Sequence, residues 1–184
     1  MNGRFIAVVG PSGVGKDSVM MALAAMEPRL TLARRVISRP TDAGGEDFEG
    51  VTAAEFGDRR NGGAFALWWQ AHGLFYGIPA TVDTALAAGQ DVLANLSRAV
   101  LPQMACRFAR TDILMLTAPA EVLAARLAAR GREDASEITR RLARADFALP
   151  DGTVAHQISN AGPLAQTVTA VRDALYPVRL KRSI

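Results

Sequence analysis

The sequence predicts an α/β fold with a mainly parallel sheet, and two observations support this prediction. Short apolar segments alternate with segments rich in helix-forming residues along most of the 184-residue chain, as expected for strands that helices cover on both faces. The first apolar segment, 6–9, runs directly into a glycine-rich loop, and a helix-forming segment follows that loop. The chain therefore opens with a predicted strand, a tight loop and a helix.

The loop at 10–18 has the spacing G-x-x-x-x-G-K, which in this strand–loop–helix context is typical of a phosphate-binding loop. Its glycines allow successive N–H groups to converge on one anion. The helix that begins near Gly15 adds its positive dipole end, and Lys16 adds a mobile positive charge. A glycine turn beside a solvated lysine is the weaker interpretation, because strand, glycines and lysine are all in register. We expect a three-layer P-loop NTPase that binds the ATP phosphates through Gly10, Pro11, Ser12, Gly13, Val14, Gly15, Lys16, Asp17 and Ser18.

The remaining elements follow from the same kinds of signal, with Pro28 ending the first helix. In the first half we expect a strand over 30–37, a polar loop over 38–47, a helix from the Thr52 capping box to about 61–63, and strands over 65–70 and 74–76. In the second half we expect helices over 81–88, 119–130, 136–148 and 163–175, and strands over 91–96, 113–116 and 154–159. Trp68 and Trp69 should point to opposite faces of their strand, which places at least one of them in a core.

The segment 38–79 interrupts the alternation of strands and helices and begins where a predicted strand ends. Ligands of open parallel sheets bind beyond the carboxyl ends of the strands. We therefore expect one domain spanning 1–184, with a core formed by 1–37 and 80–184 and a small acceptor-binding insert at 38–79.

Composition limits the classes of function. The hydrophobic fraction of 49% suffices for one core, and a formal net charge of +3 with scattered aromatic residues argues against a nucleic-acid partner. A single cysteine, Cys106, and two histidines exclude an internal disulfide and a cysteine- or histidine-rich metal cluster. No apolar run approaches the ~18 residues that a membrane span needs, and no secretory segment precedes the first strand. We expect a cytoplasmic protein without a membrane partner; the oligomeric state is not indicated.

The residues that follow Lys16 are unusual for such a loop, which ordinarily continues with Ser or Thr. Here Asp17 occupies that place and Ser18 comes next. Ser18 could approach a Mg²⁺ cofactor, and Asp17 could do so directly or through water. Equally, Asp17 could be a carboxylate stabilised by the helix dipole. Both interpretations of Asp17 remain open, and Asp17 and Ser18 are the candidate metal ligands.

Six arginines lie between 126 and 144, in a segment (126–145) that we expect to act as a lid. Arginines on a closing segment can clamp a transferring phosphoryl group and exclude water, and we assign that catalytic role, together with Lys16, to Arg130 and Arg141. For Arg126, Arg140 and Arg144, spacing alone favours positions on solvated helix faces, where arginines pair with acidic side chains one turn away.

A third group of polar residues flanks the predicted insert. Arg39 and Tyr76 could bind an anionic acceptor, and Arg98 is a further candidate. For Arg35 a charge at a strand edge is the favoured interpretation, although it too is a candidate acceptor ligand. His72 is more typical of a turn residue than of a catalytic base.

Taken in order, these motifs resemble the guanylate kinase superfamily over nearly the whole chain. The matching segments are 10–16, 37–40, 45–46, 52–56, 75–77, 88–93, 126–131, 140–142 and 158–160. The resemblance implies a single guanylate kinase-like domain, and it implies that Asn160 contacts the adenine of ATP. The departures concern the base of the acceptor: Asp42 falls near the place of a second arginine, Leu67 replaces the guanine-binding glutamate, and Ile78 replaces a hydroxyl residue. A guanine edge would then lack polar partners.

This pattern resembles one branch, the ribose 1,5-bisphosphate phosphokinase (PhnN) family of phosphonate catabolism. The marks of that branch are 16–18, 35–39, 69–77, 91–99 and 131–138. The resemblance implies transfer of the ATP γ-phosphoryl group to the 1-phosphate of α-D-ribose 1,5-bisphosphate, giving 5-phospho-α-D-ribose 1-diphosphate (PRPP). Such an acceptor is a small anionic sugar phosphate whose reacting oxygen is already ionised, so no general base is required. One alternative is a nucleoside monophosphate (guanylate) kinase. The other is a non-catalytic binding module, and the intact Gly15-Lys16 pair disfavours this second alternative.

Overall fold

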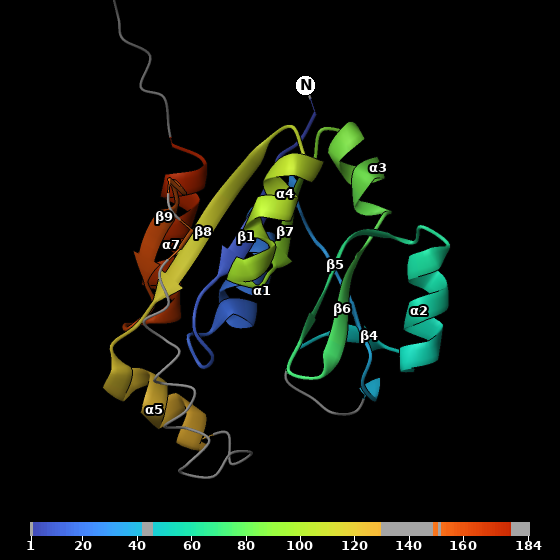
Figure 1. Cartoon of the computed structure of the whole chain (residues 1–184). Helices are drawn as coiled ribbons and strands as arrows, with labels where there is room; N and C mark the ends of the chain where they lie inside the picture. The colour runs from blue at the N-terminus through green and yellow to red at the C-terminus, as the bar shows by residue number, and fades with distance from the viewer. Residues whose placement is uncertain (1, 42–45, 130–148, 151, 178–184) are drawn as a thin grey trace, which may run out of the picture. The chain divides into compact units, whose positions relative to one another are not determined.

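A computed structural model of the chain describes residues 2–41, 46–129, 149–150 and 152–177. The chain divides into two compact units: a first unit, Met1–Val8 with Glu27–Asp112, and a second unit, Val9–Met26 with Ile113–Ile184. Strands and helices alternate along the chain (Figure 1), and four of its strand pairs are parallel, which confirms the α/β prediction. The strands are β1 (Phe5–Val9), β2 (Leu30–Leu32), β3 (Arg35–Ile37), β4 (Phe48–Gly50), β5 (Phe65–Ala71), β6 (Leu74–Pro79), β7 (Asp91–Asn95), β8 (Thr111–Thr117) and β9 (His156–Ser159). The helices are α1 (Lys16–Met26), α2 (Ala53–Asn61), α3 (Val82–Ala87), the 3₁₀ turn η2 (Arg98–Val100), α4 (Leu101–Arg107), α5 (Ala120–Ala129) and α7 (Leu164–Leu175).

The parallel sheet of the first unit contains β7 between β1 and β2. Every residue of β1 and β7 is buried, because the apolar runs of these strands are covered on both faces. At the amino-terminal end of the pair, Arg4 binds the Asp91 carboxylate through its side chain (2.7 Å) and its backbone N–H (2.7 Å), and it also binds Asp112 (2.7 Å). These contacts fix the register at the end of the sheet where the strands begin.

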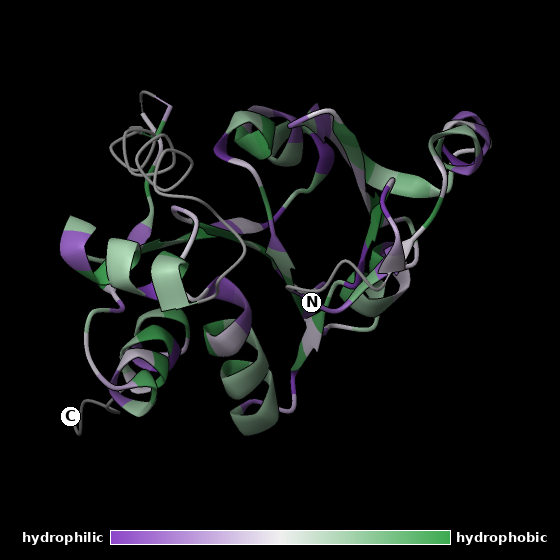
Figure 2. Cartoon of the chain, turned by 90° about the horizontal axis from the view of Figure 1, so that it is seen from below, coloured by the Kyte–Doolittle hydropathy of each residue, from purple (hydrophilic) through white to green (hydrophobic). Residues whose placement is uncertain are grey.

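The first unit also contains a second sheet with the strand order β4-β3-β6-β5. One face of this sheet is covered by α2, whose Phe56 stacks on Phe65 (4.5 Å between ring centroids) and on Phe75 (5.4 Å). The Phe65 ring lies directly on Gly77, where an added Cβ would approach the ring to 2.6 Å. The outward side of α2 is hydrophilic (Figure 2). The aromatic stack therefore attaches an otherwise polar helix to the sheet.

The predicted capping box at the start of α2 is present, and it makes the helix sensitive to pH. Glu55 accepts a hydrogen bond from the Thr52 backbone N–H (2.8 Å), and the Thr52 hydroxyl accepts one from the Glu55 N–H (3.2 Å). The hydrogen bond from the Thr52 backbone is the main reason that the pKa of Glu55 lies below its ordinary 4.5. Because the pKa is depressed in the folded state, the stabilisation by Glu55 is present above the unfolded pKa and is lost as the pH falls through the folded pKa.

We therefore expect Glu55→Gln to lower the urea midpoint of unfolding at neutral pH, and we expect this effect to shrink as the pH falls below the unfolded pKa and through the lowered folded pKa. A Thr52→Ala background provides the control: the pH dependence of the Glu55→Gln effect should shrink but persist, because alanine removes the hydroxyl and keeps the backbone N–H that is the main cause of the lowered pKa. An effect of equal size at neutral pH and below the folded pKa would contradict this account.

In the second unit, β8 and β9 form a parallel pair, and α7 packs against both α1 and β9. The buried face of α7 consists of Thr167, Val168, Val171 and Leu175, which recur at helical spacing. Among the described helices of the chain, none combines the length and the hydropathy that spanning a bilayer requires.

One expected strand needs correction, two elements were not predicted, and one expected helix lies outside the described residues. The segment 30–37 forms two strands in two different sheets. The Ala33 N–H still donates to the Leu93 carbonyl of β7 (2.9 Å), and the chain then leaves β7, so that β3 pairs with β4 and β6. Strand β4 and the helical segment 98–107 were not predicted. The expected helix over 136–148 lies outside the described residues. The prediction for the two tryptophans is confirmed, since Trp69 is buried and Trp68 is exposed.

Candidate active site

The phosphate loop of the second unit is a nest whose shape requires glycine. Gly10 (φ 150°) and Gly15 (φ 89°) both occupy backbone conformations that favour glycine. An added Cβ on Gly10 would lie 2.4 Å from the carbonyl oxygen of Leu116 in β8, and one on Gly15 would lie 2.8 Å from Nδ2 of Asn160. The loop is therefore pressed against its neighbours, and it connects β1 to α1 as the sequence predicted.

Lys16 begins α1 and turns its ammonium group back over this loop. Its Nζ donates hydrogen bonds to the carbonyl oxygens of Gly10 (2.9 Å) and Pro11 (3.2 Å). The positive charge is thus held beside the loop amides, where the helix N-terminus adds to it. This combination suits the phosphate oxygens of a nucleotide.

The two candidate metal ligands follow in the first turn of α1. Asp17 is half-buried and Ser18 is exposed. Mg²⁺ is usually held by one or two protein oxygen ligands together with substrate phosphates, and these two side chains fit that donor set. Among the described residues, no group of three acidic, histidine or cysteine side chains could hold a metal by itself.

Asn160 follows β9 directly and is 4% exposed. Its Nδ2 donates to the Val14 carbonyl (2.7 Å), and its Oδ1 accepts from the Thr167 hydroxyl (2.8 Å). Arg126 of α5 also donates to the Val14 carbonyl (3.4 Å). The spacing of Arg126 had favoured a solvated helix face, but the structure directs this side chain to the phosphate loop.

A second group of polar side chains gathers in the first unit, on the sheet face opposite α2. Arg35 binds Glu46 through both its Nε (3.0 Å) and its Nη2, and it donates from Nη1 to the carbonyl of Asn95 at the end of β7 (3.1 Å). The guanidinium also lies 5.4 Å from the ring centroid of Tyr76 and 6.0 Å from that of Trp69. Arg35 is 9% exposed. It is therefore a buried ion-paired arginine rather than a strand-edge charge.

Arg39 lies near the same carboxylate and is more accessible. Its Nη2 is 3.9 Å from Glu46 Oε1, and its guanidinium lies 4.2 Å from the ring centroid of Phe48. Its side chain is 26% exposed, against 11% for Arg35. Two arginines, Arg35 and Arg39, therefore lie beside the one carboxylate of Glu46.

The aromatic members of this face are paired across two strands. Trp69 of β5 and Tyr76 of β6 are register partners, and their rings stack 5.4 Å apart at 9°. The neighbouring register pair on the same face is Leu67 with Ile78, and both side chains are buried. On this face of the sheet the polar cluster is therefore bordered by an apolar wall, formed by Leu67 and Ile78.

The remaining predicted residues are placed as follows. Arg98 opens η2, and burial lowers the pKa of its guanidinium. His72 lies in the exposed turn between β5 and β6 with φ 52°, which confirms a turn residue. Arg130 and Arg141 lie outside the described residues.

Three residues that the sequence did not single out each contact a predicted residue: Glu46, Phe48 and Thr167. Glu46 belongs to a matching segment, but its polar loop has no periodicity that would indicate a buried partner. The contacts of Glu46 and Thr167 span 11 and 7 positions of sequence, and neither belongs to a capping or turn pattern that the sequence would reveal.

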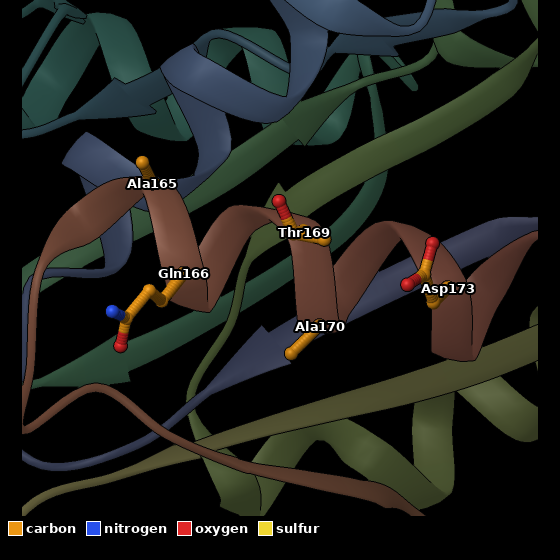
Figure 3. Close-up of a pocket in the computed structure, with 5 residues that line it drawn as sticks. All are labelled: Ala165, Gln166, Thr169, Ala170 and Asp173. Atoms are coloured by element: carbon orange, nitrogen blue, oxygen red, sulfur yellow. The ribbon is translucent and has the colours of Figure 1, made fainter.

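A shallow hollow of about 480 Å³ lies along the outer face of α7 (Figure 3). Its described lining consists of Ala165, Gln166, Thr169, Ala170 and Asp173. This lining provides one carboxylate and no cationic side chain, so it does not suit a phosphate. The candidate functional groups are therefore the phosphate loop in the second unit and, separately, the Arg35–Glu46 cluster in the first unit.

The architecture defines the class of protein. Similarity to solved structures includes guanylate kinase from Anaplasma phagocytophilum, with a TM-score of 0.63 and 17% identity over 98% of this chain and 88% of that one. A gluconokinase from Sinorhizobium meliloti 1021 has a TM-score of 0.53 and 21% identity, with 95% and 96% coverage. Together with the phosphate loop, these likenesses identify an α/β P-loop kinase fold of the guanylate kinase type.

Sequence comparison then gives the family. The chain is 53% identical over 178 residues to ribose 1,5-bisphosphate phosphokinase PhnN of Ruegeria sp. (strain TM1040), covering 96% of this chain and 94% of that protein. It is 49% identical to the protein of the same name from Pseudofrankia inefficax, with 94% and 92% coverage. The chain belongs to the ribose 1,5-bisphosphate phosphokinase PhnN family. No protein-family model matches the chain.

A different arrangement occurs in Cupriavidus necator. There the relative is named bifunctional ribose 1,5-bisphosphokinase-thymidine phosphorylase; it is 43% identical, and the match covers 94% of this chain but 29% of that protein.

Proposed function

We propose that this protein transfers the γ-phosphoryl group of ATP to the 1-phosphate of α-D-ribose 1,5-bisphosphate, producing PRPP in phosphonate degradation. The observation that carries the proposal is the 53% identity, over nearly the full length of both chains, to a relative named for that phosphokinase activity. The reaction uses ATP, and we place it in the cytoplasm, where ATP is supplied.

The donor half of the reaction is assigned to the phosphate loop. Phosphoryl transfer needs the negative charge on the donor to be neutralised and the transferring group to be held in place. Lys16 and the loop amides would supply the neutralising positive charge. We propose that Arg130 and Arg141, in a lid at 126–145, close over the transferring group. The Asp17 and Ser18 oxygens would hold Mg²⁺, which when bound neutralises charge on the donor phosphates.

The acceptor half is assigned to the segment 38–79 together with β3 and Arg98. Arg39 and Tyr76 would contact the anionic groups of the sugar, and Arg35 would hold Glu46 and the end of β7 in place. A phosphate of the acceptor is already ionised at neutral pH, so a positioned cation suffices and no general base is needed.

The choice of a sugar phosphate over GMP is supported by the wall beside this cluster. Leu67 and Ile78 are register partners and are both buried. The hydrogen-bonding edge of guanine would lose its water there without gaining a polar partner, which carries a large penalty. A sugar bisphosphate without a base meets no such penalty, and a guanylate kinase activity is therefore not favoured.

The test is an acceptor comparison with purified protein, Mg²⁺ and ATP, in which PRPP is detected directly. We expect kcat/KM for α-D-ribose 1,5-bisphosphate to exceed that for GMP by at least about 100-fold. A preparation of the Lys16→Met variant serves as the control for contaminating kinases. Turnover of GMP at a rate equal to that of the sugar bisphosphate would contradict the proposal.

A further inference from the structure

We infer that Asn160 is a positioning residue of the phosphate loop: it fixes the Val14–Gly15 peptide so that the Gly15 N–H points at a bound phosphate. The inference rests on the proposed function of the loop as the site of ATP. Asn160 would thereby contribute to phosphate recognition by fixing the shape of the loop.

The Val14 carbonyl is held from the side of the loop that faces the protein. Its oxygen accepts hydrogen bonds from Asn160 Nδ2 (2.7 Å) and from an Arg126 Nη1 (3.4 Å). A carbonyl oxygen has two lone pairs, so it can accept both. The shorter bond comes from Asn160, which makes this side chain the main restraint on the orientation of the carbonyl.

A planar trans peptide transmits this restraint to the next N–H. In such a peptide the C=O and the N–H point in opposite directions, and the described residues include no cis peptide bond. With the Val14 oxygen directed at Asn160, the Gly15 N–H is directed away from the protein side and toward the concave side of the nest. Backbone N–H groups that converge in this way are the phosphate ligands of such a loop.

The amide of Asn160 is itself fixed in one orientation. Its Oδ1 accepts a hydrogen bond from the Thr167 hydroxyl (2.8 Å), and its backbone N–H donates to the Thr117 carbonyl at the end of β8 (2.7 Å). Because the Val14 oxygen can only accept, the Nδ2 group must face it and Oδ1 must face Thr167. Thr167 is 3% exposed on the buried face of α7. A chain of contacts therefore runs from α7 through Asn160 to the loop.

The space around the contact is equally restricted. An added Cβ at Gly15 would lie 2.8 Å from Asn160 Nδ2, so the amide touches the peptide that it orients. Nδ2 and Oδ1 each have a hydrogen-bond partner within the protein, and Asn160 is only 4% exposed. The amide is therefore placed to support the phosphate loop rather than to present its polar atoms to adenine.

The experiment measures equilibrium binding of two probes, ATP and inorganic tripolyphosphate, by calorimetry in the absence of any acceptor. We expect Asn160→Ala to raise the Kd of both probes by about tenfold, which corresponds to about 1.4 kcal/mol. Thr167→Val should raise both by about threefold, because the amide loses the partner that orients it, and Thr167→Ser should restore binding. Thr169→Val is the matched control, because Thr169 lies on the exposed outer face of the same helix (Figure 3).

A weaker ATP affinity with unchanged tripolyphosphate affinity would identify an adenine contact and overturn the inference. Wild-type affinities in Thr167→Val would overturn it as well, and this variant decides the matter if Asn160→Ala does not fold. Binding of ATP but not of tripolyphosphate by the wild-type protein would also count against it. Failure of the wild-type chain to bind ATP would instead refute the proposed function, so the two failures are distinguishable.

Discussion

Lys16→Met is expected to lower kcat for phosphoryl transfer by about 10²–10³-fold, the loss typical when one preorganised charge-stabilising donor is removed. The Lys16 ammonium is held beside the loop by the carbonyls of Gly10 and Pro11, so it adds positive charge where the donor phosphates would bind. Methionine keeps a long flexible side chain and removes only that charge. Initial rates of PRPP formation at saturating ATP provide the measurement.

The controls for Lys16 separate charge from geometry. Lys16→Arg retains the positive charge but replaces a compact ammonium by a planar fork, so we expect partial activity at most. Arg29→Met removes a cation that is 66% exposed and should leave kcat unchanged. If the Lys16→Met variant kept more than a tenth of the wild-type kcat, the assignment of Lys16 as a catalytic residue would be wrong.

Glu46→Ala is expected to have the largest effect on stability among the substitutions considered, a loss of about 3–5 kcal/mol in the free energy of unfolding. The Arg35 side chain is 11% exposed and that of Glu46 is 15% exposed. Removing the carboxylate leaves the guanidinium buried beside Trp69 and Tyr76 without its counter-charge. Urea denaturation of the variant and of the wild-type protein measures the loss.

An exposed pair on the same stretch of chain gives the matched control. Arg34 and Asp47 are bridged at 3.0 Å, with side chains 55% and 79% exposed, and Asp47→Ala should cost less than about 1 kcal/mol. The double variant Arg35→Leu with Glu46→Leu should recover much of the loss, because the buried guanidinium is removed together with its carboxylate. Equal effects of Glu46→Ala and Asp47→Ala would refute the account.

Much of the fold was predictable because its signals are local. The glycine spacing before Lys16 specifies a loop whatever surrounds it, and Thr52 and Glu55 specify a helix start within four residues. The strand over 30–37 was predicted incorrectly because its β-forming composition is nearly continuous. The last backbone hydrogen bond to β7 is made by Ala33, and from Arg35 on the chain pairs with β4 and β6, a change that composition does not reveal.

The candidate site was predictable only in part, for the same reason. Lys16 belongs to a contiguous motif, so its position beside the loop amides could be predicted. Glu46 and Thr167 act through partners that folding brings to them: Arg35 for the first and Asn160 for the second. Asn160 in turn reaches Val14 across 146 positions of sequence. Spacing along the chain carries no information about such contacts.

The Phe65 ring on Gly77 limits how this protein can evolve. A side chain at position 77 would meet the ring at 2.6 Å, and a displaced ring would lose its stacking on Phe56. Position 77 can therefore accept a larger residue only after position 65 has become smaller, and the intermediate would have a weakened α2. Descendants of this sequence should keep the two residues or exchange both, since neither step is neutral by itself.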